Sequence, residues 1–280
     1  MNVTLPDNKL DKKAKFVYIS IIGVCIISII LVIYAQFFEG RTIMTVGNLK
    51  GKSETGYEVL KSEFDQLFTN KLQQDDEKYQ SKKTESSKKL VYTGYTNNEK
   101  EENSYSLDVS IPYINVKNNT IQKYNEEIKN TFENKAEEIV KTKNKNSIYT
   151  VEYSSYIQED ILSIIIRANL KEGSNAQRVI IKTYNYNLND NKEIDLKTLL
   201  QMENVEKSFA QNKIDTEIQS QQKKAEDLKA LGYPIYERKI NSQIYKVDNI
   251  SDFYYHDGSI YIIFAYGNEK FTSEVDIAII

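Results

Sequence analysis

The sequence predicts an α+β protein in which a single N-terminal transmembrane helix is followed by a mainly antiparallel sheet with packed helices. Residues 16–38 form a long run without a charged side chain. Residues 90–280 contain segments in which apolar and polar residues alternate, as in half-buried strands. Amphipathic helical patterns lie between these segments. The order of strand pair, helix, three strands, helices and strands is typical of α+β proteins.

The first element is the apolar run FVYISIIGVCIISIILVIYAQFF at residues 16–38. At about 1.5 Å of rise per residue, it is long enough to cross a hydrocarbon core of about 30 Å. Lysines precede the run at positions 9, 12, 13 and 15, and a basic flank stays in the cytoplasm. The sequence therefore predicts a single-pass protein of the cell membrane, with residues 1–15 as a cytoplasmic tail and the C-terminal domain outside.

Two alternatives to an anchor are a cleaved signal peptide and a buried core helix. A signal peptide would have an apolar core of about 7–15 residues, followed by small residues at the cleavage site. Here the run is longer and ends with Phe37 and Phe38, which do not suit a signal peptidase. The run is also apolar on all sides and lies beside a basic flank, which favours a membrane span over a core helix.

Composition narrows the classes of function. The formal net charge is -3 and the pI is about 5.6, so the chain as a whole lacks the basic surface that nucleic-acid binding requires. The only cysteine is Cys25, which lies within the apolar run. We therefore expect an outer domain without disulfides that depends on core packing, as suits the surface of a Gram-positive bacterium.

Residues 39–89 are predicted to form a juxtamembrane spacer and a helix. Glycines among polar residues indicate the spacer. Apolar residues then recur at steps of three and four, which indicates an amphipathic helix. These residues are Val59, Leu60, Phe64, Leu67, Phe68 and Leu72. Residues 90–280 follow as the extracytoplasmic α+β domain, and the pattern also fits two subdomains at about 90–195 and 196–280.

Two strands begin this domain, at residues 89–95 and 105–114. Pro112 is expected to end the second strand or to place it at a sheet edge. Asn119 or Thr120 then caps a helix that extends to about residue 140 and has one apolar stripe. The stripe consists of Ile121, Tyr124, Ile128, Phe132, Ala136, Ile139 and Val140.

Three further strands are predicted at residues 148–157, 161–170 and 178–188. The second of them contains the run Ile161, Leu162, Ile164, Ile165 and Ile166. Such a strand is too apolar to have one face in water, so we expect it at the centre of the sheet.

Helices and a hairpin are predicted to complete the chain. Asp195 caps a short helix, and a longer helix extends from about residue 204 to 230, where Gly232 stops it. The middle of the longer helix is polar on all sides at residues 219–224, so part of it must be exposed. Strands at 252–255, 260–265 and 273–279 end the chain, and the turn at 256–258 contains Asp-Gly, a strong hairpin signal.

The outer domain has one histidine, His256, beside Asp257 in the predicted turn. Without a cysteine outside the apolar run, a Cys–His nucleophile pair and a Cys–His zinc site are excluded there. No glycine-rich phosphate-binding motif occurs, so no nucleotide cofactor is expected. We therefore predict no catalytic, cofactor-binding or metal-binding residues, and a protein that is not an enzyme.

Paired carboxylates would be the remaining route to catalysis, because glycoside hydrolysis needs two of them about 5–10 Å apart. The candidates alternate with lysines on the 120–140 helix or lie in turns, which indicates solvated surfaces. Asp190, Asn191 and Glu193 resemble part of a calcium loop, but they lack the EF-hand spacing and are predicted to form a turn. The candidate carboxylates are Glu126, Glu127, Glu133, Glu137, Glu138, Glu159 and Asp160.

Four segments carry a resemblance to a known family: IPYI, DILSIIIRANL, KTYNYNLNDNKEIDLKTLL and DFYYHDGSIYIIFAYG. From about Leu90 onward, their order resembles the paired extracytoplasmic domains of unknown function in RsiV-type anti-sigma factors and PdaC-type peptidoglycan deacetylases. That family often has a Gly-Gly-Ala-His-Gly loop where this chain has residues 172–176, EGSNA. The resemblance implies the fold, a place outside the membrane, and a lysozyme-like protein or wall polymer as ligand. It does not extend to sigma control or deacetylation.

These observations predict a membrane-anchored extracytoplasmic binding or sensing module that faces the cell wall. Its expected partners are the membrane, through residues 16–38, and a lysozyme-like protein or cell-wall polymer, with no nucleic acid. A carboxylate-dependent cell-wall enzyme and an assembly partner of another membrane protein are the alternatives. No ligand-binding residue follows from the sequence, and the loop at 171–177 and the turn at 256–258 are the places to map.

Overall fold

The computed structural model describes residues 63–71, 77–143 and 146–280. The predicted tail at 1–15, the anchor at 16–38 and much of the spacer at 39–89 lie outside these residues. Within the described ranges, no helix has both the length and the apolar character needed to span a membrane. The membrane anchor therefore stays a prediction.

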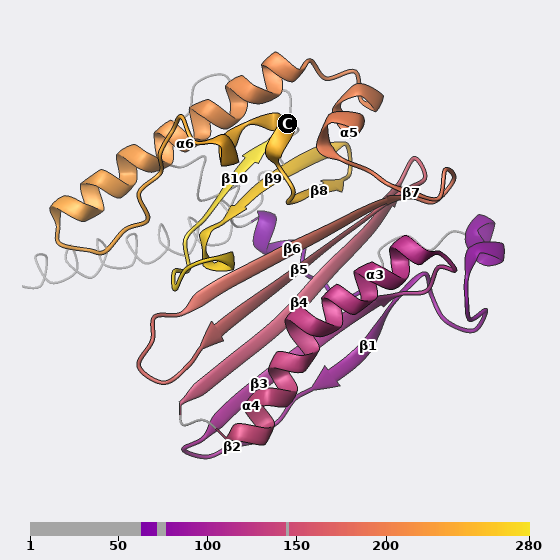
Figure 1. The fold of residues 1–280 in the computed structure, drawn as a ribbon, viewed down its shortest axis with the longest axis horizontal. Coiled ribbons are helices and arrows are strands. Elements are labelled where there is room, and N and C mark those ends of the chain that lie inside the picture. The colour runs from indigo at the N-terminus through magenta and orange to yellow at the C-terminus, as the bar shows by residue number, and fades with distance from the viewer. Residues whose placement is uncertain (1–62, 72–76, 144–145) are drawn as a thin grey trace, which may run out of the picture. The chain divides into compact units, whose positions relative to one another are not determined.

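Seven strands form the larger sheet, in the order β1-β3-β4-β5-β6-β7 with β2 paired to β3 (Figure 1). Its pairs are antiparallel except β3 with β4, which are parallel because a helical crossover joins them. The mainly antiparallel sheet and the central position of β5 are thus confirmed. The strands are β1 (Val91–Asn97), β2 (Lys100–Glu101), β3 (Tyr105–Ile114), β4 (Ser147–Gln158), β5 (Ile161–Lys171), β6 (Arg178–Asn187) and β7 (Lys192–Glu193).

The crossover consists of α3 (Asn119–Ile128), a π-helical turn (Lys129–Glu133) and α4 (Asn134–Thr142). The predicted cap at Asn119 or Thr120 is wrong by a residue or two. Asn118 caps the helix, because its extended backbone lets its side-chain oxygen accept the Thr120 N–H at 2.7 Å. The apolar stripe is confirmed, since all its members except Val140 are buried and Val140 packs against the same core.

Pro112 does not end β3, which continues to Ile114 and lies between β1 and β4. Pairing with β4 stops at Val109, so the missing N–H of Pro112 costs no bond to that neighbour. Towards β1, the register shifts between Thr93 and Tyr95, opposite Pro112. The proline is therefore accommodated by a bulge and by the local absence of a second neighbouring strand.

The smaller sheet has three antiparallel strands in the order β10-β9-β8: β8 (Phe253–His256), β9 (Ser259–Ala265) and β10 (Val275–Ile279). The predicted hairpin is confirmed. Asp257 and Gly258 connect β8 to β9 with φ of 49° and 74°. Positive φ at both central residues is what a tight two-residue hairpin turn needs, and Asp-Gly adopts it readily.

The 3-10 turn η3 (Glu77–Lys82) precedes β1, and its Tyr79 is buried in the core shared with α3 and α4. The elements that pack on the smaller sheet are α5 (Leu196–Met202), α6 (Lys207–Ala230) and the 3-10 turns η5 (Gln243–Tyr245) and η6 (Val247–Asn249). The 3-10 turn η7 (Tyr266–Asn268) follows β9 and lies against β6. Asp195 caps α5 as predicted, through the Thr198 N–H at 2.7 Å. The longer helix begins at Lys207 rather than near 204, and Gly232, with φ of 88°, follows its end.

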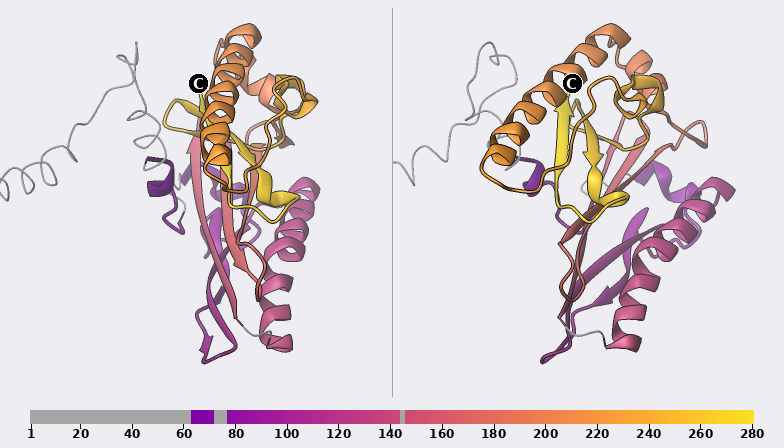
Figure 2. Two further views of the ribbon diagram at one scale, coloured as in Figure 1. Left: turned by 90° about the vertical axis from the view of Figure 1, so that its left-hand side faces the viewer. Right: turned by 60° about the vertical axis from the view of Figure 1, so that its left-hand side comes forward.

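Successive side chains of a strand point to opposite faces of its sheet, and this alternation defines the layers of the fold. On β5, Ile164 and Ile166 face the core shared with α3 and α4, whereas Ile165 faces the smaller sheet. On β8, Tyr254 faces the larger sheet and Tyr255 faces the core shared with α5 and α6. The two sheets thus lie face to face, with α3 and α4 along the larger and α6 along the smaller (Figure 2).

Residues 63–71 contribute to the core between the sheets. Phe64 and Leu67 are buried there. The helix expected to reach Leu72 ends at residue 66, because Asn70 instead exchanges hydrogen bonds of 2.8 Å with the backbone of Tyr153 in β4. This pairing occupies β4 beyond the point where its pairing with β3 stops.

The outer edge of β6 joins the two sheets. The side-chain amide of Asn268 donates to the Ile181 carbonyl and accepts from the Ile181 N–H, each at 2.9 Å. The Val179 N–H donates to the Thr272 carbonyl at 3.1 Å. Gly267 allows this approach, since a Cβ there would lie 2.1 Å from the Val179 carbonyl oxygen.

We predict that Gly267→Ala destabilises the domain by about 2–4 kcal/mol, because backbone rather than a flexible side chain blocks the added methyl group. Urea unfolding measures the change. Gly232→Ala is the control: a Cβ there meets nothing within 4 Å, so only the positive φ is penalised, by about 1 kcal/mol. Equal losses in the two variants would contradict the tight contact.

Candidate functional site

The predicted carboxylate candidates do not converge on one cleft. Glu133 accepts a hydrogen bond of 2.6 Å from Tyr113, and Glu138 pairs with Lys135 at 3.1 Å. Asp160 lies in the β4–β5 turn with Lys78 at 2.8 Å, and this ammonium helps to lower the pKa of the carboxyl. Across the described ranges, no three His, Cys, Asp or Glu side chains are placed to hold a metal ion.

The loop at 189–191 is a turn, as predicted. The Asn187 side-chain oxygen accepts the N–H groups of Asn189 and Asp190, each at 2.8 Å. Asp190 in turn pairs with Lys192 at 3.3 Å. These contacts explain the residue pattern without a calcium ion.

His256 is part of the hairpin rather than of a cleft. Its ring lies 4.3 Å from that of Tyr156 and 5.7 Å from that of Tyr254, measured between centroids. Burial lowers the pKa of His256, so the ring is neutral at pH 7. The adjacent Gly258 N–H donates to the Gln158 side chain at 2.8 Å, which fixes the turn against β4.

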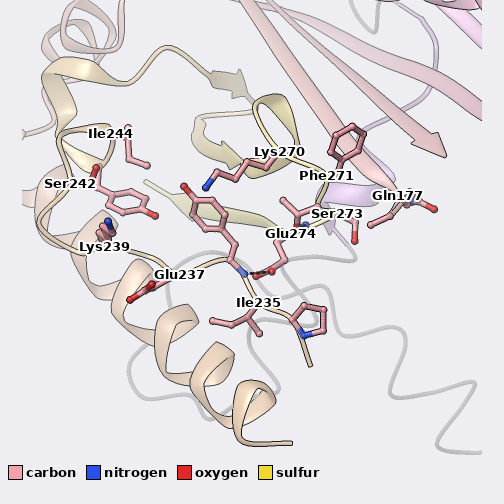
Figure 3. A pocket seen from close by; sticks show the side chains of 15 residues that line it. Gln177, Ile235, Glu237, Lys239, Ser242, Ile244, Lys270, Phe271, Ser273 and Glu274 are labelled. Carbon is pink, nitrogen blue, oxygen red and sulfur yellow. Dashed lines mark hydrogen bonds between the residues drawn. The ribbon is translucent and has the colours of Figure 1, made fainter. Parts of the chain in front are cut away.

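A pocket of about 710 Å³ lies elsewhere, between the chain that follows α6 and the chain that precedes β10 (Figure 3). Its volume is in the range of small-ligand sites. One wall is residues 270–274, a second is formed from residues 234–245, and Ala176 and Gln177 contribute from the β5–β6 loop. The loop at 171–177 therefore reaches the pocket, whereas the turn at 256–258 does not line it.

Stacked tyrosines lie at the pocket. Tyr236 lines it and stacks on Tyr266, with 3.9 Å between ring centroids and 17° between ring planes. The Tyr266 hydroxyl donates to Asp276 and lies 3.0 Å from the Tyr245 hydroxyl. Burial and the negative charge of Asp276 raise the pKa of Tyr266 far above its usual value, so this hydroxyl keeps its proton.

A buried ion pair lies beneath these rings. Arg238 binds Asp276 through two hydrogen bonds of 2.6 and 2.8 Å, and their side chains are 5% and 1% exposed. A second carboxylate, Glu274, contacts Arg238 at 2.9 Å and accepts the Tyr236 N–H at 2.6 Å. Burial alone would lower the pKa of Arg238, but the contacts with Asp276 and Glu274 outweigh burial and raise it.

The same network reaches α6. The Arg238 N–H donates to the Gln222 side chain at 2.7 Å. The adjacent residue, Gln221, is buried and donates to Glu217, one turn earlier on α6, at 2.7 Å. The prediction that part of residues 219–224 must be exposed is thus confirmed, since Gln219, Ser220 and Lys223 are exposed, while Gln221 faces inward.

The rim of the pocket combines charged and apolar side chains. Phe271 is 56% exposed, and Ile244 is 46% exposed. The Lys270 ammonium lies 5.4 Å from the centre of the Tyr236 ring. Apolar surface with a few polar groups around a firmly held ring is suited to binding.

Sequence reasoning missed this site because its partners are far apart in the chain. Arg238 and Asp276 are separated by 38 residues. One local signal was available, since Asp276 is the only charged residue in the strand VDIAI of β10. A charge within an apolar strand predicts a buried partner, but the pattern does not say which residue supplies it.

Comparisons with known proteins found only weak similarity, and only to solved structures. No family model matches the sequence, and no curated protein matches it. A DUF3298 family protein from Pseudomonas aeruginosa PAO1 is similar with a TM-score of 0.37 and 7% identity, over 68% of this chain and 87% of that one. A DUF3298 family member from Bacteroides fragilis is similar with a TM-score of 0.33 and 13% identity, over 62% of this chain and 80% of that one. The likeness to RsiV- and PdaC-type proteins stays a prediction.

We predict that Arg238→Met lowers stability by about 3–5 kcal/mol, because it leaves the Asp276 carboxylate buried without its cation. The double variant Arg238→Met/Asp276→Leu should recover most of this loss, since no fully buried charge then remains unpaired; Glu274 also loses Arg238, but it is 29% exposed and keeps the Tyr236 N–H. Urea unfolding of the two single variants and the double variant forms the cycle that measures the coupling. Additive losses would show that the pair is not coupled.

Glu217 gives a pH-dependent prediction. Burial raises the pKa of the Glu217 carboxyl, and the negative charge of Asp276 adds to this effect. The hydrogen bond from Gln221 lowers the pKa, but by less than burial raises it. A raised folded-state pKa costs stability once pH exceeds it, and the cost disappears below the unfolded pKa of about 4.3. Glu217→Gln should therefore raise the thermal midpoint at pH 7 and leave it unchanged below about pH 4.

Glu226→Gln is the matched control for Glu217→Gln. Glu226 is exposed on the same helix and accepts a hydrogen bond of 3.1 Å from Gln222, the same four-residue spacing. Its substitution should shift stability by less than about 0.5 kcal/mol at both pH values. A stabilisation by Glu217→Gln that persists at low pH would exclude the titration as its cause.

Proposed function

We propose that this protein is a binding or sensing module, anchored in the cell membrane by residues 16–38 and facing the cell wall with its C-terminal domain. Its ligand, a cell-wall polymer or a lysozyme-like protein, binds at the pocket beside Tyr236. The observation that carries the proposal is the buried Arg238–Asp276 pair, which holds the pocket's aromatic surface in place. A pre-formed site loses less freedom on binding.

The side chains that line the pocket favour binding over catalysis. The lining includes the hydroxyl groups of Ser242 and Ser273 but no histidine to activate them. Glu274 is engaged on both oxygens, by Arg238 and by the Tyr236 N–H, so it is poorly suited to act as an acid or base. The carboxylate-enzyme alternative therefore finds no support at this pocket.

We expect the full-length chain, purified in detergent, to bind lysozyme, peptidoglycan or teichoic acid saturably, and Phe271→Ala to weaken that binding about tenfold. Phe271 lines the pocket and is exposed, so the part of its ring that Arg178 does not cover can contact a ligand. Biolayer interferometry against each immobilised ligand measures the affinity.

Phe209→Ala is the matched control. Phe209 is 50% exposed on α6, is not among the pocket residues, and has a lysine over its ring as Phe271 has an arginine. Equal weakening by the two substitutions would exclude the pocket as the binding site. Absence of binding to all three ligands would overturn the proposed function.

A further inference from the structure

We propose that the pocket binds a primary ammonium group of an aminated saccharide or polyol on the Tyr236 ring. Without this ligand, the ammonium group of Lys270 occupies the same place over the ring. This inference rests on the proposed function and names the ligand class of the same pocket. It follows from the charges around one aromatic ring.

The Tyr236 ring has one face covered by Tyr266 and the other approached by the Lys270 ammonium. Figure 3 shows Lys270 extending into the pocket from the 270–274 wall. The negative face of an aromatic ring attracts cations. The structure therefore contains a cation at the place where a cationic ligand would bind.

Acidic groups around this ring strengthen the preference for a cation. Glu274 binds the Tyr236 backbone N–H and Asp276 lies below in contact with Tyr266, and Arg238 offsets only one of these two negative charges. Burial, with the nearby negative charge of Glu269, raises the pKa of Tyr236. Glu237 adds a further carboxylate to the lining.

The basic groups on the same surface are already used or lie apart from the ring. Arg238 is held by Asp276 and Glu274. Lys239 also lines the pocket, but of these two lining lysines it is Lys270 whose ammonium lies over the Tyr236 ring. Lys270 is exposed on a surface segment, so its side chain can swing aside when a ligand ammonium takes its place.

The shape and remaining polarity of the pocket favour a saccharide or polyol over a folded protein. A concave volume of about 710 Å³ suits a small unit of a polymer, whereas protein partners usually bury flat surfaces of about 800 Å² per partner. Ser242, Thr272 and Ser273 provide hydroxyl groups that can pair with those of the ligand. Phe271 offers an apolar face for its carbon-bound hydrogens.

The test uses the full-length chain in detergent and isothermal titration calorimetry at about pH 6, where amines are protonated. A glucosamine tetramer and an N-acetylglucosamine tetramer share one backbone and differ in charge. We expect the glucosamine tetramer to bind at least about tenfold more tightly, because acetylation removes the ammonium.

Lys270→Gln distinguishes a pocket that binds a cation from a pocket that binds an anion. Removing the internal competitor should tighten binding of the glucosamine tetramer about threefold to tenfold, whereas a site that uses Lys270 to hold an anion would lose affinity. Lys123→Gln, on the exposed side of α3, makes the same change in net charge and should leave the affinity unchanged. Weaker binding after Lys270→Gln, or equal tightening by both variants, overturns the inference.

Four further outcomes identify which proposal has failed. Equal binding of the two tetramers, or tighter binding of the peptide acetyl-Gly-Lys-Gly-amide than of the glucosamine tetramer, overturns the aminated saccharide and leaves the binding module intact. If neither tetramer binds while peptidoglycan, teichoic acid or lysozyme does, the inference fails alone. If none of these ligands binds, the proposed function fails with it.

Discussion

The hydrogen bonds between the Asn268 side chain and the backbone of Ile181 hold together the parts of the structure that form the pocket. β6 pairs with β7 only at its last two residues, so the earlier part of its outer edge needs other partners. Asn268 supplies a donor and an acceptor there, as a neighbouring strand would. Because Gly267 permits this approach, the segment after η7 lies against β6 and forms one wall of the pocket. The β5–β6 loop ends where β6 begins, which brings Gln177 to the same place.

Asparagine side chains end the sheet elsewhere in the same way. Asn125 of α3 accepts the Ile114 N–H and donates to the Ile114 carbonyl, each at 2.9 Å, where β3 has passed its last pair with β4. Asn115, just after β3, forms a similar pair of hydrogen bonds with the backbone of Glu85, at 2.9 and 2.7 Å, but Glu85 lies in the loop before β1 rather than in a strand. An uncovered strand edge is a template for unwanted pairing with another chain. A side-chain amide blocks that pairing, so Asn125 and Asn268 each protect a strand edge, and all three asparagines tie a helix or loop to the sheet.

The sequence predicted those features whose causes are local. Alternation placed the strands, Asp257-Gly258 placed the hairpin, and Asp195 placed the start of α5, because each signal involves neighbouring residues. The prediction that Pro112 ends its strand or places it at a sheet edge was wrong. β3 can contain this proline because its pairing with β4 stops earlier, and β4 begins more than thirty residues later in the chain. The polar stretch of α6 is partly exposed, as predicted, but the sequence did not indicate that Gln221 and Gln222 take part in the network around Arg238. The pocket was not predictable, because segments from three separate parts of the chain form it and the pattern of each suggests only a loop.

The buried ion pair helps to explain why the pocket can be specific. An apolar pair could fill the same volume without the cost of desolvating two charges, so the Arg238–Asp276 contact is not needed for stability as such. Apolar contacts are non-directional, however, and would not fix the distance between the chain before Arg238 and the chain before Asp276. The hydrogen bonds of Arg238 to Asp276 and Glu274, and of Glu274 to the Tyr236 N–H, fix that distance. The ring of Tyr236 and the wall that carries Lys270 are therefore set against each other before a ligand arrives.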